Sequence, residues 1–175
     1  MIRLGTTLPA LALVVAGCRG PSPRAAVDSA ADASRLGRVE RAGAVLLPAG
    51  GVRWSVTPRD AVGAWAWPDG RVAVSRALVD RLDDQELAAA LAHEVGHLLD
   101  GGHLPGRHAL DGGVDDIERR ADRIGCGILL QHGVPGDAMP RMLSKVAAAT
   151  RDRTGEVVTR VAAAAAACVT PPTSP

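Results

Sequence analysis

Two histidines and a glutamate in the middle of the chain have the types and spacing of a metal site. They form the pattern H-E-x-x-H at His93, Glu94 and His97. On a helix, the i, i+4 spacing turns both imidazoles to one face, within reach of one ion. Two neutral imidazoles bind Zn²⁺ and leave positions for a third ligand and for a water of lowered pKa. Glu94, beside a ligand, can take the proton of that water and pass it to a leaving amine.

Two residues compete for the place of the third ligand. His103 follows His97 by six residues, which is the metzincin spacing, although Asp100 replaces the glycine of that pattern. Glu118 belongs to the next predicted helix, and a carboxylate from a following helix is the gluzincin arrangement. The spacing of these residues alone does not decide between them.

The motif is only meaningful on a helix, and the sequence from 83 to 102 predicts one. Asp83 is a suitable N-cap, and Glu86 three residues later completes a capping-box pattern. An apolar stripe at near-helical spacing follows, and two glycines end the segment: Leu87, Leu91, Val95, Leu98, Gly101 and Gly102. We therefore expect the motif on a half-buried helix face.

The other elements are predicted around this helix. A helix is expected from 26 to Gly43, where glycine ends it, and another short helix over 76–82. Alternating residues and turn signals predict strands over 52–57, 62–67 and 71–75. Three more helices are expected over 114–132, 137–148 and 155–169. The predicted fold class is α+β, mainly helical, with a small antiparallel sheet beside the H-E-x-x-H helix.

Composition limits the class of protein. The chain has 175 residues, 47% of them hydrophobic, which is enough for one domain with a core. Its formal net charge is +1 without a basic block, so no nucleic-acid partner is expected. Three Trp and no Tyr or Phe leave the core to aliphatic residues, and no tyrosine can stabilise an oxyanion. His103, His108, His132 or an arginine would have to do so.

The N-terminus reads as an export signal. Arg3 and a short apolar run precede Cys18. The end of the run, Val15 to Cys18, resembles the bacterial lipoprotein signal, in which the cysteine is acylated. We expect removal of 1–17, a lipidated tether over 18–25, one domain over 26–170 that carries the zinc-peptidase motif, and a tail over 171–175. The alternatives are an ordinary signal peptide cut near Ala16 and a buried helix.

The expected location of the chain in the cell also affects the state of its cysteines. Arg19, in place of Asp at the second mature position, favours the outer membrane facing the periplasm, by resemblance to the sorting rule of Gram-negative lipoproteins. In an oxidising compartment, Cys126 and Cys168 form either a disulfide or two small buried hydrophobic residues. Their spacing does not decide.

Three segments, in order, resemble the HtpX and CAAX-prenyl-protease peptidase family, and most closely its small periplasmic lipoprotein members. They are VGAWAWPDGRVAV from Val62, ELAAALAHEVGH from Glu86, and ERRADRIG from Glu118. The resemblance implies a gluzincin-type mini-domain with one Zn²⁺ per chain, Glu118 as third ligand, and Asp122 supporting a ligand imidazole. The chain lacks the T-H-P motif expected near the C-terminus, so the arginine that this region often carries is unplaced.

The resemblance also implies an activity. We expect a membrane-anchored endopeptidase that cleaves unfolded or misassembled proteins of the cell envelope. An edge strand holds the substrate in such peptidases, and the expected strand is 71–75, through Val72, Ala73 and Val74. One alternative is a zinc-stabilised chaperone or assembly lipoprotein without catalysis, and another is a metzincin-like peptidase that uses His103.

Overall fold

The computed structural model describes residues 30–47, 49–100, 114–150 and 156–169. The signal, the tether with Cys18, and the loop with His103 and His108 lie outside the described residues. The elements are α1 (Ala30–Leu46), β1 (Arg53–Thr57), β2 (Ala64–Trp67), β3 (Arg71–Ser75), α2 (Arg76–Arg81), α3 (Asp84–Asp100), α4 (Val114–Gln131), α5 (Ala138–Thr150) and α6 (Glu156–Ala167). The predicted α+β class with a mainly helical chain is confirmed.

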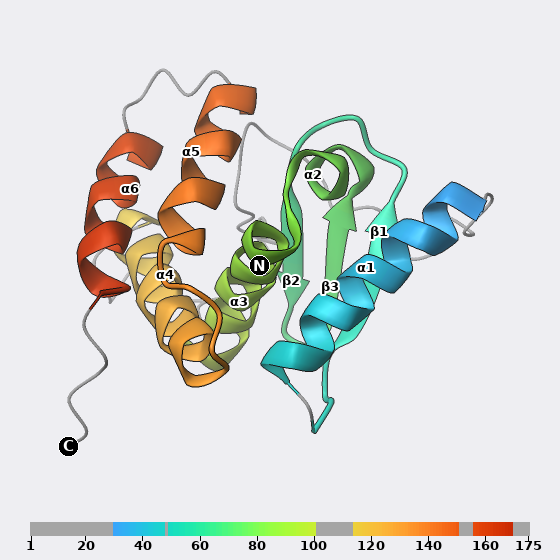
Figure 1. The fold of residues 1–175 in the computed structure, drawn as a ribbon, viewed down its shortest axis with the longest axis horizontal. Coiled ribbons are helices and arrows are strands. Elements are labelled where there is room, and N and C mark those ends of the chain that lie inside the picture. Colours follow the sequence, from blue (N-terminus) through green and yellow to red (C-terminus); the bar gives the residue numbers. More distant parts are fainter. Residues whose placement is uncertain (1–29, 48, 101–113, 151–155, 170–175) are drawn as a thin grey trace, which may run out of the picture.

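Helix α3 is the centre of the fold. It lies between the sheet on one side and α4, α5 and α6 on the other, and it packs against α1, α4, α5 and β2 (Figure 1). Every residue from Glu86 to His97 is buried, so the helix has no wide solvent-exposed face along this stretch. The predicted start is confirmed: the Glu86 amide donates to Asp83 Oδ1 at 2.8 Å, and the Asp83 amide donates to Glu86 Oε2 at 2.9 Å.

The sheet is mixed, with strand order β1-β3-β2. Strands β2 and β3 pair antiparallel, as predicted, but β1 pairs with β3 in parallel, so the expectation of a wholly antiparallel sheet is wrong. Strand β3 is central because it is apolar on both faces: Val72, Ala73 and Val74 are 0%, 3% and 0% exposed.

The central place of β3 corrects the predicted substrate strand. Both edges of β3 already bond to neighbouring strands, so Val72, Ala73 and Val74 have no backbone edge left for an added strand. Within the described residues, β1 and β2 are the edge strands. Strand β2 is the edge strand nearer to α3 (Figure 1).

Helix α1 continues three residues beyond its predicted end at Gly43. A Cβ at Gly43 would lie 2.4 Å from the Trp54 indole, so the missing side chain allows the tryptophan of β1 to pack directly against α1. The glycine therefore serves packing and does not end the helix. The close contact seats α1 on the inner face of the sheet, beside Val72 and Val74 of the common core. None of the described helices is long and apolar enough to cross a membrane.

Candidate metal centre

Two glycines set the close crossing of α3 and α4 on which the site depends. A Cβ at Gly96 would lie 2.5 Å from the carbonyl oxygen of Ala121 in α4. A Cβ at Gly125 of α4 would lie 3.1 Å from the backbone of Ala92 and His93. Each glycine therefore admits the backbone of the facing helix, and the helices meet closely at the level of the motif.

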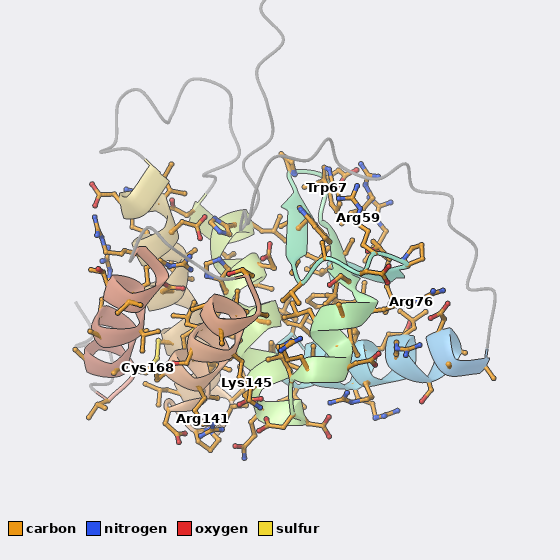
Figure 2. All side chains as sticks on the ribbon, turned by 90° about the horizontal axis from the view of Figure 1, so that it is seen from above. Arg59, Trp67, Arg76, Arg141, Lys145 and Cys168 are labelled. Carbon is orange, nitrogen blue, oxygen red and sulfur yellow. A yellow bond between two sulfur atoms is a disulfide. The ribbon has the colours of Figure 1, made fainter. Side chains whose placement is uncertain are left out.

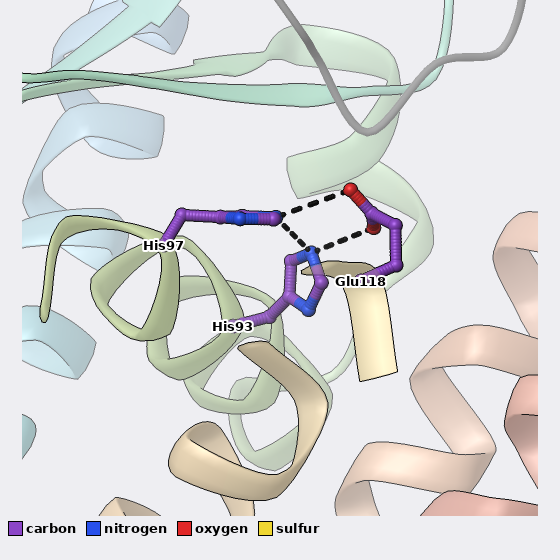
Figure 3. Close-up of side chains that lie close together, drawn as sticks. All are labelled: His93, His97 and Glu118. Carbon is purple, nitrogen blue, oxygen red and sulfur yellow. Dashed lines mark hydrogen bonds and ion pairs between the residues drawn. The ribbon is translucent and has the colours of Figure 1, made fainter. Parts of the chain in front are cut away.

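This crossing brings three ligand-type side chains together. His93 and His97 project from α3, and Glu118 projects from α4 to meet them (Figure 3). The two Nε2 atoms are 3.0 Å apart, His93 Nε2 is 3.4 Å from Glu118 Oε2, and His97 Nε2 is 3.3 Å from Glu118 Oε1. Two ligands about 2.0–2.2 Å from a tetrahedral zinc ion are about 3.3–3.6 Å apart. The two distances to Glu118 lie within this range, and the distance of 3.0 Å between the Nε2 atoms is about 0.3 Å below it, so a small separation of the imidazoles would let the three side chains hold one zinc ion.

The charges buried around these side chains also fit a divalent cation. Glu94, Glu118 and Asp122 are buried, and Arg160 is the buried cation that faces them. Three carboxylates and one guanidinium leave a formal charge of −2 when both histidines are neutral. A buried charge of this size needs compensation, and Zn²⁺ supplies +2.

The pKa values show the same excess of negative charge. Burial opposes the protonation of His93, but its hydrogen bonds to the Asp122 and Glu118 carboxylates outweigh burial and raise its pKa to about 10. Burial raises the pKa of Glu94, and the neighbouring histidines oppose the rise. Burial opposes the ionisation of Glu118, yet contacts with His93 and His97 hold its pKa well below the usual range.

Asp122 orients the first ligand. Its Oδ1 lies 2.8 Å from His93 Nδ1, which places the imidazole proton on Nδ1 and turns the Nε2 lone pair toward His97 and Glu118. The resemblance implied this supporting role, and the structure brings the two residues together. Glu118 and Asp122 stand one helical turn apart on α4, so one face of that helix serves both positions.

Arg160 is the residue of the site that sequence reasoning did not place. Its Nε and Nη2 donate to the two oxygens of Asp122 at 2.9 Å, and its Nη1 lies 2.9 Å from Glu118 Oε2. A signal was available: Arg160 is a single charge within the apolar part of α6, the run Val157 to Ala167. A long buried side chain of this kind is kept only where it meets carboxylates.

A disulfide fastens α6, the helix that carries Arg160. Cys126 of α4 bonds to Cys168, just after the end of α6, with the Cα atoms 4.9 Å apart. Of the two alternatives left open by the spacing, the structure contains the disulfide. Cys126 lies four residues after Asp122, so the covalent bond and the ion pairs of Arg160 tie the same two helices together.

The remaining candidates for oxyanion stabilisation are not all near the site. His132 follows the end of α4, fourteen positions after Glu118, and the helical rise places the two about 20 Å apart. His132 is therefore too far away to act there. Among the described residues, Arg160 is the arginine that reaches the cluster.

The elements and the cluster together define a class of protein: an α+β domain whose H-E-x-x-H helix and following helix present two histidines and a glutamate, as zinc metallopeptidases do. The model of peptidase family M48 matches residues 39–112, from α1 through the motif helix. The chain is similar to this family of zinc metallopeptidases over less than half of its length, and the match agrees with the resemblance drawn from the sequence. The match ends before Glu118, so the geometry of α4 carries the place of that residue. No curated protein matches the chain.

Proposed function

We propose that the chain is a zinc-dependent endopeptidase of the bacterial cell envelope, that one Zn²⁺ binds per chain, and that His93, His97 and Glu118 hold it. The observation that carries the proposal is the cluster of three ligand side chains whose ligand atoms lie within 4.8 Å of one another, in a buried site of formal charge −2 with Glu94 beside it. A structural zinc site would need no extra buried carboxylate next to its ligands.

Glu94 is the proposed general base. It is 1% exposed, and its Oε1 has no hydrogen-bond partner within the described part of the chain. When bound, Zn²⁺ would supply Lewis-acid chemistry at a water molecule and at the peptide carbonyl. Glu94 would take a proton from the attacking water and deliver it to the leaving amine nitrogen. The raised pKa of Glu94 suits a group that must both accept and release a proton.

The ligands are held in place by a second layer of contacts. Asp122 fixes the tautomer of His93, and Arg160 bridges Asp122 and Glu118. These contacts orient a ligand from each of the two helices before any metal binds, which lowers the reorganisation that binding requires.

Strand β2 replaces β3 as the proposed substrate strand. The Ser75 amide donates to the Gly63 carbonyl at 2.9 Å, so the pair Gly63–Ser75 is a hydrogen-bonded pair of the ladder. Such pairs alternate in antiparallel sheets, and Trp65 and Trp67 are therefore the next residues bonded to β3. The backbone groups of Ala64 and Ala66 consequently point to the other edge, where an extended peptide could pair with them.

The proposal also covers the cellular location and the biological role of the enzyme. The apolar N-terminal run and Cys18 support a lipid anchor, and Arg19 supports the outer membrane facing the periplasm. Backbone pairing to an edge strand supports extended or unfolded proteins as substrates, because a folded chain has few unpaired backbone groups to offer. We therefore propose quality control of envelope proteins as the task.

The test combines zinc content with casein cleavage on the purified full chain and two variants. Glu94→Gln removes the base and keeps a side chain of the same shape, and Glu40→Gln makes the same change at an exposed site on α1. We expect one zinc per chain in all three proteins, and cleavage by the wild type and Glu40→Gln only. A chelator should abolish cleavage, and added zinc should restore it.

The other outcomes separate the competing functions. Zinc in every protein with cleavage by none would favour the non-catalytic chaperone or assembly function. Equal cleavage by wild type and Glu94→Gln would refute the role of the base.

A further inference from the structure

We propose that Trp65 and Trp67 select the substrate: the peptide that pairs with β2 carries large apolar side chains, aromatic or β-branched, at two positions two residues apart. The inference rests on the proposed function, because it takes β2 as the strand on which the substrate lies. It adds the chemical class of side chain that the site prefers.

The two tryptophans lie on one face of the sheet. Side chains alternate along β2, and its burial alternates with them: Ala64 and Ala66 are buried, whereas Trp65 and Trp67 are half-buried. Ala64 and Ala66 share their face with Val72 and Val74 in the core. The tryptophans therefore project from the opposite, outer face, and α3 packs beside the strand that carries them.

Each indole is held in place by an arginine. The guanidinium of Arg59 lies 5.1 Å from the centre of the Trp65 ring, and that of Arg71 lies 5.3 Å from the Trp67 ring. Figure 2 shows Trp67 and Arg59 at the sheet end of the molecule, far from Cys168, which follows the end of α6. Two rings that are already fixed lose little freedom when a ligand contacts them.

The register leaves one side of Trp67 for a substrate. Arg71 is the partner of Trp67 on β3, so the arginine takes the β3 side of the ring. A strand added at the edge formed by Ala64 and Ala66 would place alternate side chains on the outer face, next to Trp65 and Trp67. Cross-strand pairs of aromatic residues with aromatic or β-branched residues are the favourable ones.

The charge of the neighbouring arginines further limits which substrate side chains fit beside the tryptophans. Arg59 stands beside the Trp65 ring, so a lysine or arginine of the substrate at that position meets like charge. Arg71 stands beside the Trp67 ring and is paired with Asp69 Oδ2 at 2.7 Å, so the repulsion is weaker there. The preferred segment therefore has large apolar residues at alternate positions and no basic residue there. Such a pattern is typical of strands whose one face is buried in a folded protein, and a folded protein exposes it only when it unfolds.

The experiment uses the full zinc-loaded chain and three ten-residue peptides that are identical except at two positions two residues apart. These positions hold phenylalanine and valine, two alanines or two lysines. Each cross-strand pair is worth about a two- to fivefold change, so we expect kcat/KM of the apolar peptide to exceed that of the alanine peptide about 4- to 25-fold. The lysine peptide should be the poorest of the three.

Variants assign the preference to the tryptophans. Trp67→Ala should reduce the ratio of the apolar to the alanine peptide about two- to fivefold, and Trp67→Phe should keep it. Val158→Ala removes an exposed apolar side chain from α6 and should leave the ratio unchanged. A ratio near one in the wild type, or the same ratio in Trp67→Ala, would overturn the inference.

Binding separates this inference from the proposed function. The affinities of the same peptides are measured by fluorescence anisotropy on the zinc-loaded Glu94→Gln chain. If the wild type cleaves no peptide, the proposed peptidase activity fails, and the affinity ratio still decides: a preference of about 4- to 25-fold supports selection by the tryptophans, and equal affinities refute it.

Discussion

Gly96→Ala is the substitution that tests most sharply how the metal centre is built. Alanine is the better helix former by about 1 kcal/mol, so helix propensity alone predicts a more stable protein. The structure predicts the reverse. The new Cβ would lie 2.5 Å from the Ala121 carbonyl oxygen, whereas ordinary contact begins at 3.4 Å.

The magnitude follows from that overlap. To restore ordinary contact, α4 must move away from α3 by about 0.9 Å, the difference between those two distances. Glu118 would move with α4, and its distances to His93 and His97, now 3.4 and 3.3 Å, would widen beyond the tetrahedral range. Crowding of a packed core costs about 1–3 kcal/mol. Displaced ligand support typically costs about 10- to 100-fold in metal affinity, and we expect a loss of zinc affinity of at least this size.

The assay is zinc affinity by competition with a chromophoric chelator, together with urea denaturation of the metal-free protein. Gly127→Ala is the matched control, because a Cβ at Gly127, also in α4, meets nothing within 4 Å. It should raise stability by about 0.5–1 kcal/mol and leave zinc affinity unchanged. If Gly96→Ala binds zinc as tightly as the wild type, the close crossing of α3 and α4 does not set the site.

Three further predictions concern the contacts around the site and the fold. Replacing Arg160 by methionine leaves the buried Asp122 and Glu118 without their cation, and it should lower the free energy of unfolding in urea by about 3–5 kcal/mol. Arg160→Lys keeps the charge and should lower it less. Equal stability of the wild type and both variants would contradict this role of Arg160. Removing the disulfide with Cys126→Ser and Cys168→Ser together, which opens a link across 42 residues, should cost about 2–4 kcal/mol, and a reductant should destabilise the wild type but not the double variant. The hydrogen bond from Arg76, opposed by burial and helped by Arg35, lowers the pKa of Asp32 below 3.8. The stability that Asp32 provides is therefore present above about pH 4 and is lost as the pH falls through the lowered pKa. In urea denaturation at a series of pH values, Asp32→Asn should lose less stability than the wild type on the acid side.

The parts of the fold that the sequence predicted are those set by local chemistry. The start of α3 depends on Asp83 and Glu86, which are three residues apart, and both hydrogen bonds of the capping box form as expected. The β2–β3 hairpin likewise follows from its own turn residues, Pro68, Asp69 and Gly70.

The sheet order was not predictable in the same way, because it depends on partners distant in sequence. Strand β3 inserts between β1 and β2, which are its predecessors in the chain. One signal favoured this place: Val72, Ala73 and Val74 form a continuous apolar run, and a strand that is buried on both faces needs neighbours on both sides. Gly43 was expected to end helix α1, but it leaves room for the Trp54 ring to pack against the helix. A glycine in the sequence is compatible with either role, and the packed structure distinguishes them.

In the metal site, too, the residues close together in sequence were predictable and the distant one was not. His93, Glu94 and His97 lie on one helix, so a motif can predict them, and the choice between Glu118 and His103 needed the resemblance. Arg160 reaches the site from α6, 38 residues after Asp122, through a contact that no local pattern encodes.

The central claim is that His93, His97 and Glu118 bind one zinc ion, and zinc stoichiometry in three proteins tests it most directly. The wild type, Glu118→Ala and His103→Ala are purified, dialysed against a weak chelator and analysed by atomic absorption, with circular dichroism to show that each is folded. We predict one zinc per chain in the wild type and in His103→Ala, and a folded Glu118→Ala that loses its zinc. Zinc retained by Glu118→Ala and lost from His103→Ala would contradict the site described above and assign the third position to His103.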